Sequence, residues 1–581
     1  MKNNTFTIAV IGCGPRGLSA LENLFISLQN TSTNCKINVI IFEKTKHLGS
    51  GPIYRNNQPD SNWLNISERA LTIEARPKIK INNSTVAAFP SYHQWTKKPK
   101  QEILNNRHEV FPKRSFFGDY LRERYQSIAK VLEQENLLKI INQKVIEVRH
   151  ITDGLEILTI NQSTYKAHEV VLTIGHQDTV LSDQLKAWKL HTSINPNCFA
   201  FEETYPIKNV LAIDYKHKPH HVGIRGFGLA MMDVTRALVN ANGGVFKIIN
   251  EMTHQMSYTS GPSKLKLIPF SLDGLPMACK PLNSEVDSLF MPSKADLQHL
   301  ETVLSRVSKD KSYDNGNQFV LDAISNIASK QFIKLNNKAY PHSYSENQLQ
   351  AIILKYLSED AFKHNLIVPT TQPAQDIIQS YVHMASATKP ISLDYCLGQV
   401  WRHCEPILYK TMSHCNLKDE VINEVIAIDE RMKRYAFGPP IESLQQLLAL
   451  AKEGTLDLSF VNDPKIKLVK DGWLLEKNKS TIICDIMVNS VLDSPDIKKV
   501  NTPIISNLLK NEIIQPVYGN LGIETLPNGL VVSKNKTQNN NIALLGRLAK
   551  GSVVGVDAIL ECFGPRIKDW SDGVCNRIKQ N

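Results

Sequence analysis

Three glycines near the start of the chain have the spacing of a nucleotide-binding turn. Gly12, Gly14 and Gly17 directly follow the apolar run at 6–11. In such a turn the first glycine permits the tight bend, the second lets backbone approach a pyrophosphate, and the third lets the helix pack closely on the strand. The free N–H groups at the amino terminus of that helix then face the phosphates. This spacing alone is a weak signature, but it predicts a dinucleotide site.

An acidic residue follows the turn at a suitable distance. A second β-type run, 37–42, ends at Glu43. A carboxylate at this place can accept hydrogen bonds from both hydroxyls of a ribose, whereas it would repel a 2′-phosphate. We therefore expect FAD or NAD, and not NADP, at this first site. Gly49 and Gly51 fit a second close approach of backbone to the same cofactor, although an ordinary turn explains them nearly as well.

A second glycine turn stands in the middle of the chain. It supplies Gly226 and Gly228 but has Met231 where the third glycine would stand, and a bulky side chain there must hold helix and strand farther apart. The turn indicates a nicotinamide-nucleotide site, and a purely structural turn is the alternative. Downstream, Ser260 and Lys264 offer a hydroxyl and a cation for a 2′-phosphate, which would favour NADPH over NADH.

The elements that must position these residues follow the order of an α/β protein. A strand, helix and strand open the chain, and short β-branched runs then predict a meander and a buried strand that ends at Gly175. A second strand, turn and helix occupies 221–239. Two-dinucleotide-binding flavoproteins have a strand ending in glycine just before the chain crosses into their second domain. The order therefore favours two Rossmann-like domains, with FAD at the first.

From residue 294 the apolar period becomes helical, and the chain of 581 residues is too long for one hydrophobic core. We predict two dinucleotide-binding domains with a helical insertion. The FAD-binding domain comprises 1–215 and 437–581, the NAD(P)-binding-like domain comprises 216–293, and the helical insertion comprises 294–436.

Composition narrows the function classes. Apolar residues make up 42% of the chain, and no stretch has the length and apolar character of a membrane span. The net charge of +11 comes from interleaved charges, without the basic and aromatic track that nucleic acid requires. The predicted first strand leaves no room for a leader before it, so we expect a cytoplasmic location. The sequence leaves open whether the chain forms a homo-oligomer.

The ten cysteines do not indicate a redox or metal centre. They form no C-x-x-C pair, so we expect reduced thiols and no disulfide reductase chemistry. His403-Cys404 and His414-Cys415 repeat after eleven residues but fit no zinc-ligand spacing, and we expect no metal site. No G-x-S-x-G elbow of a hydrolase is present.

A series of short motifs recurs in a familiar order across nearly the whole chain. These are Gly12 to Leu18 with Pro15-Arg16, Leu64-Asn65-Ile66, Phe89-Pro90-Ser91-Tyr92 with Trp95, Phe111-Pro112-Lys113-Arg114 with Gly118, Thr173-Ile174-Gly175-His176, Gly226-Phe227-Gly228-Leu229 with Asp233, Ser271 with Gly274-Leu275-Pro276, and Phe437-Gly438-Pro439-Pro440. In them the chain resembles the bacterial FAD/NAD(P)-binding proteins, a family that includes flavin-dependent amino-acid N-monooxygenases such as nitrosuccinate synthase.

The resemblance implies an FAD-containing oxidoreductase that takes hydride from NADPH or NADH. Its substrates would be O₂, activated at the flavin C4a position, and the amine nitrogen of an amino acid or similar small molecule. Pro15 and Arg16 would belong to the first cofactor turn, and Asn65 and Arg114 would lie near the flavin or its phosphates. A turn and an ion pair are equally open roles for the latter two. Because the cofactor carries the chemistry, the sequence identifies no catalytic residue.

Two other functions remain open at this point. One is an FAD dehydrogenase or reductase with an acceptor other than oxygen. The other is a flavin-binding regulatory protein without turnover.

Overall fold

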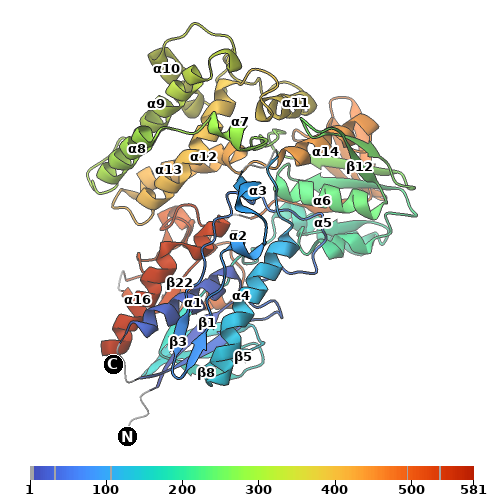
Figure 1. Cartoon of the computed structure of the whole chain (residues 1–581). Helices are drawn as coiled ribbons and strands as arrows, with labels where there is room; N and C mark the ends of the chain where they lie inside the picture. The colour runs from blue at the N-terminus through green and yellow to red at the C-terminus, as the bar shows by residue number, and fades with distance from the viewer. Residues whose placement is uncertain (1–4, 32–34, 105–107, 494, 536–537, 581) are drawn as a thin grey trace.

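The computed structural model describes residues 5–31, 35–104, 108–493, 495–535 and 538–580. Two mainly parallel sheets and a region of helices make up most of this part of the chain (Figure 1). The predicted α/β class is confirmed by these sheets. Among the described residues, no helix is both long enough and apolar enough to cross a membrane.

The first sheet contains the first glycine turn. Its strand order is β21-β22-β9-β1-β2-β5, and every neighbouring pair is parallel except β21 and β22. Side chains of β1 are buried on both faces of the sheet, as expected of a parallel strand that is covered on both sides. The strands are β1 (Thr5–Ile11), β2 (Lys36–Phe42), β5 (Leu138–Ile141), β9 (Glu169–Leu172), β21 (Leu530–Val532) and β22 (Gln538–Leu544).

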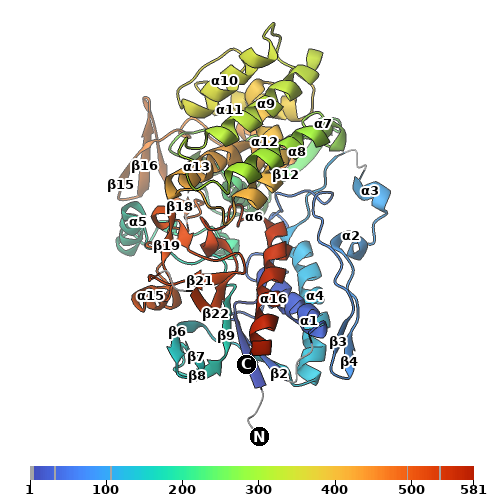
Figure 2. The ribbon, with the colours of Figure 1, turned by 90° about the vertical axis from the view of Figure 1, so that its left-hand side faces the viewer.

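Alternate residues of β1 belong to two different cores. Ile8 and Val10 pack with the helices on one face, and Ala9 and Ile11 pack with the elements on the other. Figure 2 shows the three helices together on their side of the sheet. They are α1 (Pro15–Gln29), α4 (Arg114–Gln134) and α16 (Pro565–Gln580), and the opposite face is covered by the meander β6 (Val145–Ile151), β7 (Gly154–Thr159) and β8 (Thr164–Ala167) with α15 (Pro503–Lys510).

The second sheet is entirely parallel and contains the second glycine turn. Its order is β10-β18-β11-β14, and α6 follows the turn. The meander β15-β16-β17 and α5 share a core with one of its faces. The bounds are α5 (Asp183–Ile194), β10 (Phe199–Phe201), β11 (His220–Arg225), α6 (Leu229–Ala241), β14 (Leu265–Phe270), β15 (Lys465–Val469), β16 (Gly472–Lys477), β17 (Ser480–Cys484) and β18 (Ile486–Asn489).

The strand pairing corrects the predicted domain boundaries. Residues 199–201 and 486–489 were expected in the FAD-binding domain, but as β10 and β18 they pair within the second sheet. Asp485 separates β17 from β18, and its carboxylate accepts a hydrogen bond from the His221 backbone at 2.8 Å. The chain therefore returns to the second sheet before it returns to the first.

The strand that follows α6 does not join the second sheet. It is β12 (Val245–Asn250), and within the described residues it pairs with β13 alone (Gln255–Thr259), in an antiparallel hairpin. The place beside β11 is taken by β14 instead. Most of the β12 side chains are exposed, so no buried face holds this strand in the parallel sheet.

The helices from α8 to α13 lie above both sheets in the view of Figure 1, and α14, which follows them in the chain, lies beside β12. Buried residues of these helices join one core with Val222, Leu267 and Val488 of the second sheet. The helices are α8 (Lys294–Val307), α9 (Gln318–Lys334), α10 (Glu346–Ser358), α11 (Ala374–Ala385), α12 (Leu393–Met412), α13 (Asp419–Ala436) and α14 (Ile441–Glu453).

A fully buried carboxylate attaches the last helix to the first sheet. Glu169, at the start of β9, accepts hydrogen bonds from Trp570 Nε1 at 3.0 Å and from Arg577 Nε and Nη2 at 2.9 and 2.6 Å. Burial raises the pKa of Glu169, and the bonds from Arg577 and Trp570 oppose that rise. Loss of Arg577 would leave the carboxylate without its compensating charge.

We predict that Arg577→Met lowers the free energy of unfolding by about 3 kcal/mol, because an uncompensated buried charge is costly. The matched control is Arg149→Met, which removes the exposed Arg149–Glu156 pair and should cost less than about 1 kcal/mol. Urea unfolding followed by tryptophan fluorescence measures both. Equal midpoints for the two variants would contradict the role assigned to Glu169.

Candidate cofactor sites

The first glycine turn adopts a backbone that excludes side chains. Gly12 has a φ of +91°, and a Cβ there would lie 2.7 Å from the carbonyl oxygen of Thr173. A Cβ at Gly17 would lie 2.5 Å from the carbonyl oxygen of Gly12. Gly14 is the N-cap of α1, and Pro15 occupies the first helical position, where its missing N–H is not needed. The turn and the helix amino terminus thus have the arrangement that a pyrophosphate requires.

A second loop, which contains Gly49 and Gly51, approaches this turn. The Gly49 N–H donates to the carbonyl oxygen of Cys13 at 2.7 Å. A Cβ on Gly51 would lie 3.2 Å from the Cα of Gly14, so the two backbones face each other without side chains between them. Both Gly49 and Gly51 have a positive φ. That they contact a cofactor stays a prediction.

Glu43 lies at the turn. Its Oε2 accepts a hydrogen bond from the Cys13 N–H at 2.8 Å, and its Oε1 accepts from the N–H and the hydroxyl of Thr45, both at 2.9 Å. The side chain is buried, at 7% exposure. The chain therefore presents a fixed carboxylate beside the glycine backbone, which is the chemistry that ribose hydroxyls require.

Gly175 and residues near the carboxyl terminus lie on the other side of the first turn. Gly175 follows β9 with a φ of +65°, and space is open where its Cβ would stand. The Arg16 guanidinium donates to the carbonyl oxygen of Val556 and packs against Gly546. The side chain of Arg16 thus points toward the carboxyl-terminal segment, although its backbone lies in the first turn of α1.

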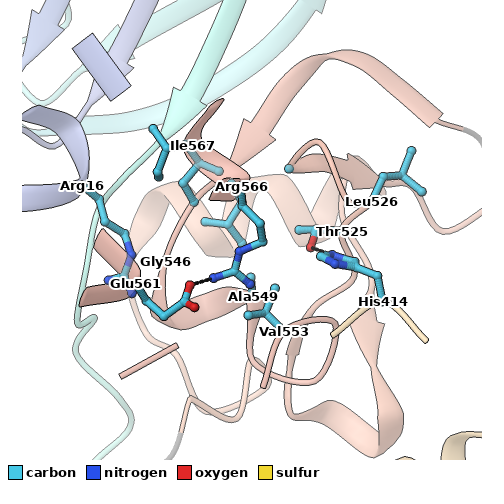
Figure 3. Close-up of a pocket in the computed structure, with 13 residues that line it drawn as sticks. Arg16, His414, Thr525, Leu526, Gly546, Ala549, Val553, Glu561, Arg566 and Ile567 are labelled. Carbon is cyan, nitrogen blue, oxygen red and sulfur yellow. Dashed lines mark hydrogen bonds and ion pairs between the residues drawn. The ribbon is translucent and has the colours of Figure 1, made fainter. Parts of the chain in front are cut away.

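Arg16 lines a pocket that the sequence did not indicate (Figure 3). Arg566, paired with Glu561, lies on another wall of it, and His414 approaches Thr525 Oγ1 at 3.3 Å. Burial, with the nearby charge of Arg566, lowers the pKa of His414 to about 4. The residues come from segments far apart in the chain, so no local spacing could have revealed them.

The second glycine turn repeats the backbone of the first. Gly226 has a φ of +114°, and a Cβ there would lie 2.6 Å from Ser490 Oγ. Gly228 caps α6 in the same extended conformation that Gly14 has at α1. The difference is Met231, which is fully buried in the core where the first turn has Gly17. Helix and turn cannot approach as closely here as at Gly17.

Ser260 and Lys264 are not brought to this turn. The turn begins after Arg225, which pairs with Phe270, whereas the Lys264 carbonyl oxygen accepts from His220 at the other end of β11. The length of β14 separates the two places by about 20 Å. The 2′-phosphate and the pyrophosphate of one NADPH are joined through a single ribose, which does not span this distance. Lys264 and the turn at Gly226 therefore cannot contact the same nucleotide, and the role predicted for Lys264 fails on geometry.

Asn65 and Arg114 line a small pocket between the two units, and their contact with a flavin stays a prediction. Arg114 Nη2 lies 3.0 Å from Asp233 Oδ2, on α6, and the Tyr205 hydroxyl donates to the same oxygen at 2.5 Å. Arg236 pairs with the other carboxylate oxygen and donates from Nε to the carbonyl oxygen of Ser61. Burial opposes the charge on Arg114, but Tyr205 and Asp233 outweigh it and hold its pKa above the ordinary value.

Lys280 also contacts this region, and the sequence analysis did not identify it as a functional residue. Its Nζ donates to the carbonyl oxygen of Asn65. Burial, and then the charge of Arg402, lowers the pKa of Lys280 to about 7. Asp287 nearby contacts Arg69 at 2.9 Å and Arg402, and its Oδ1 lies 3.2 Å from His403. His403 is therefore part of a buried charge cluster and not of the Cys-His pattern considered above.

Comparison with known proteins finds one family model and several distant relatives. Residues 9–177 match the model of the FAD-NAD(P)-binding family. An L-aspartate N-monooxygenase (nitrosuccinate-forming) of Streptomyces cremeus is 24% identical over 145 residues, which are 22% of each chain. Nitrosuccinic acid synthase of Aspergillus oryzae is 23% identical over 244 residues, 41% of this chain and 36% of the relative. The chain thus matches well under half the length of these relatives.

Solved structures are similar over more of the chain. Ornithine hydroxylase from Pseudomonas aeruginosa is 10% identical, with 98% of this chain and 99% of that chain covered at a TM-score of 0.44. A cyclohexanone monooxygenase mutant from Rhodococcus sp., bound to NADP⁺, is 12% identical, with 99% and 87% covered at a TM-score of 0.46. Residues 9–177 are thus similar to the FAD-NAD(P)-binding family, and the chain is distantly similar to the nitrosuccinate-forming L-aspartate N-monooxygenases.

Proposed function

We propose that the protein is an FAD-dependent monooxygenase that uses NADPH or NADH and O₂ to hydroxylate the amine nitrogen of an amino acid or similar small molecule. One observation carries this proposal: two dinucleotide-type turns stand on two mainly parallel sheets, and a buried ion-pair network joins α6, the helix of the second turn, to the start of α4 in the first unit. The similarity to L-aspartate N-monooxygenases supports the reaction class.

The residues of the first site fit FAD. The backbone at Gly12, Gly14 and Gly51 forms a cradle that any Cβ would fill or crowd, and Glu43 supplies a carboxylate for ribose. Bound FAD would supply the hydride acceptor and the means of activating oxygen. The chain itself would hold the pyrophosphate at the amino terminus of α1 and fix the two units through Asp233.

The amine substrate sets a second requirement, because a protonated amine is not a nucleophile. Lys280 is half-buried against the loop that contains Asn65, and its pKa of about 7 lets Nζ hold or release a proton near neutral pH. We assign Lys280 the role of accepting the substrate proton, directly or through water, in its neutral form.

Purified protein tests the cofactor and the acceptor together. We expect a flavin spectrum that anaerobic NADPH or NADH bleaches and that air restores. We also expect O₂ consumption to rise with a suitable amine and hydroxylated product to appear. Turnover with another acceptor under nitrogen would favour a dehydrogenase, and a flavin that neither nucleotide reduces would favour a regulatory protein. Absence of flavin after reconstitution with FAD would rule out all three functions.

We predict that Gly12→Ala abolishes FAD retention, because the new Cβ collides with the carbonyl oxygen of Thr173, a backbone atom directly after β9 that cannot rotate away as a side chain could. The matched control is Gly454→Ala at the end of α14, which has a similar φ of +83° but open space around the Cβ. The control should bear only the backbone strain, about 1 kcal/mol, and retain FAD. Absorbance of flavin per chain after gel filtration measures both, and equal retention would contradict the proposed site.

We predict that the hydroxylation rate of the native protein rises with pH through about 7, since Lys280 must lose its proton to act as a base. Lys280→Arg keeps a donor for Asn65 but stays protonated, so the rising limb should disappear and the rate near pH 8 should fall at least tenfold. Initial rates across pH 6–9, with FAD content matched between samples, provide the measurement. An unchanged pH profile in Lys280→Arg would show that Lys280 does not accept the substrate proton.

A further inference from the structure

Two histidines and a glutamate from distant segments come together where a loop of the first unit meets the β12–β13 hairpin. His108, Glu251 and His254 each offer one ligand atom, and these atoms all lie within 4.8 Å of one another. The imidazole centroids of His108 and His254 are 3.8 Å apart. None of the three takes part in the glycine turns or in the Asp233 network.

The backbone on both sides of this cluster is fixed. The Glu109 N–H, next to His108, donates to the carbonyl oxygen of Leu282 at 2.7 Å. In the hairpin turn, the Asn250 carboxamide accepts from the Met252 N–H at 2.9 Å. Gln445 of α14 donates to the carbonyl oxygen of Thr253 at 2.8 Å, so that helix holds the turn in place. In Figure 1 α14 and β12 are seen beside each other.

A second carboxylate lies beside one of the histidines. Glu442 Oε1 lies 2.6 Å from His254 Nδ1, and both side chains are nearly buried. A carboxylate on one ring nitrogen is the usual device that fixes a metal-binding imidazole and raises the basicity of the other nitrogen. Glu442 therefore has the position of an outer partner of His254 in a metal site.

We propose that His108, Glu251 and His254 bind one divalent transition-metal ion of the zinc class. Neutral imidazole and carboxylate are ligands that zinc prefers, and three protein ligands leave a fourth position for water. Zinc–ligand bonds of about 2.0–2.2 Å place tetrahedral donors roughly 3.4 Å apart. Because the three ligand atoms already lie within 4.8 Å of one another, side-chain movements of about 1 Å would complete the site. Local spacing gave no sign of it, because His108 is distant in sequence from the other two.

The degree of burial indicates what the ion does. His254 is buried, His108 is half-buried and Glu251 is exposed, so one side of the site faces solvent and can load without unfolding. The ion would bond the loop of the first unit to the hairpin of the second. It would therefore act as a cross-link between the two units, independent of any flavin.

Calorimetric titration of the full-length, tag-free, metal-stripped protein with ZnCl₂ tests the proposal. We expect one zinc ion per chain, with a rise in the thermal unfolding midpoint. His108→Gln, His254→Gln and Glu251→Gln should each weaken this binding at least tenfold and remove the thermal shift. Glu442→Gln should weaken it about 10- to 100-fold, as expected for an outer partner. His299→Gln, which changes an exposed histidine of α8, should bind as the native chain does.

Two results would overturn the site: no stoichiometric zinc binding by the native chain, or binding by His108→Gln and Glu251→Gln that matches the His299→Gln control. These two variants change side chains that are not fully buried, so the test does not depend on whether His254→Gln folds. Visible absorption of bound Co²⁺ in place of zinc gives a second readout, because its intensity reports a tetrahedral ligand set. Neither readout uses flavin or activity, so the result stands apart from that of the proposed function.

Discussion

A single buried carboxylate, Asp233, determines how the two dinucleotide-type units face each other. It lies on the helix that follows the second glycine turn, and it is compensated by Arg114 from the first unit and by Arg236 from its own helix. A carboxylate exposed at only 2% is stable when its hydrogen bonds and charges are satisfied from several sides. Any sliding of one unit past the other would break these contacts. The relative position of the two turns is therefore fixed by electrostatics and not by shape alone.

The same constraint explains why the interface is polar although the cores on either side are apolar. Arg236 lies over the Trp63 ring at 4.5 Å and donates to Ser443 at 2.9 Å, so one side chain contacts the first unit, its own unit and α14. Planar guanidinium groups suit this task because they stack and donate in several directions at once. Lys280 differs because its compact ammonium group shifts its pKa readily when buried.

Local patterns predicted the local structure well. The spacing of Gly12, Gly14 and Gly17 predicted a tight turn, and the structure has one, with a positive φ at Gly12. Glu43 lies beside this turn. These features depend on residues close in sequence, for which sterics are decisive. Lys280 and the strand partner of β11 could not be predicted in this way, because their neighbours come from segments hundreds of residues away. The misplaced role of Lys264 has the same origin, since a sequence does not show which edge of a sheet a loop will join.

The pairing of β9 with β22 and of β11 with β18 has a consequence for the synthesis of this chain. Central strand β9 pairs with β22, which is complete only at residue 544, and β11 pairs with β18, which is complete only at residue 489. During synthesis both sheets therefore have an open edge until most of the chain has left the ribosome. Such long-range pairing makes folding slow and leaves unpaired strands that can associate with other chains. Both sheets thus become complete only late in translation, and a chaperone that shields strand edges would act on them during that interval.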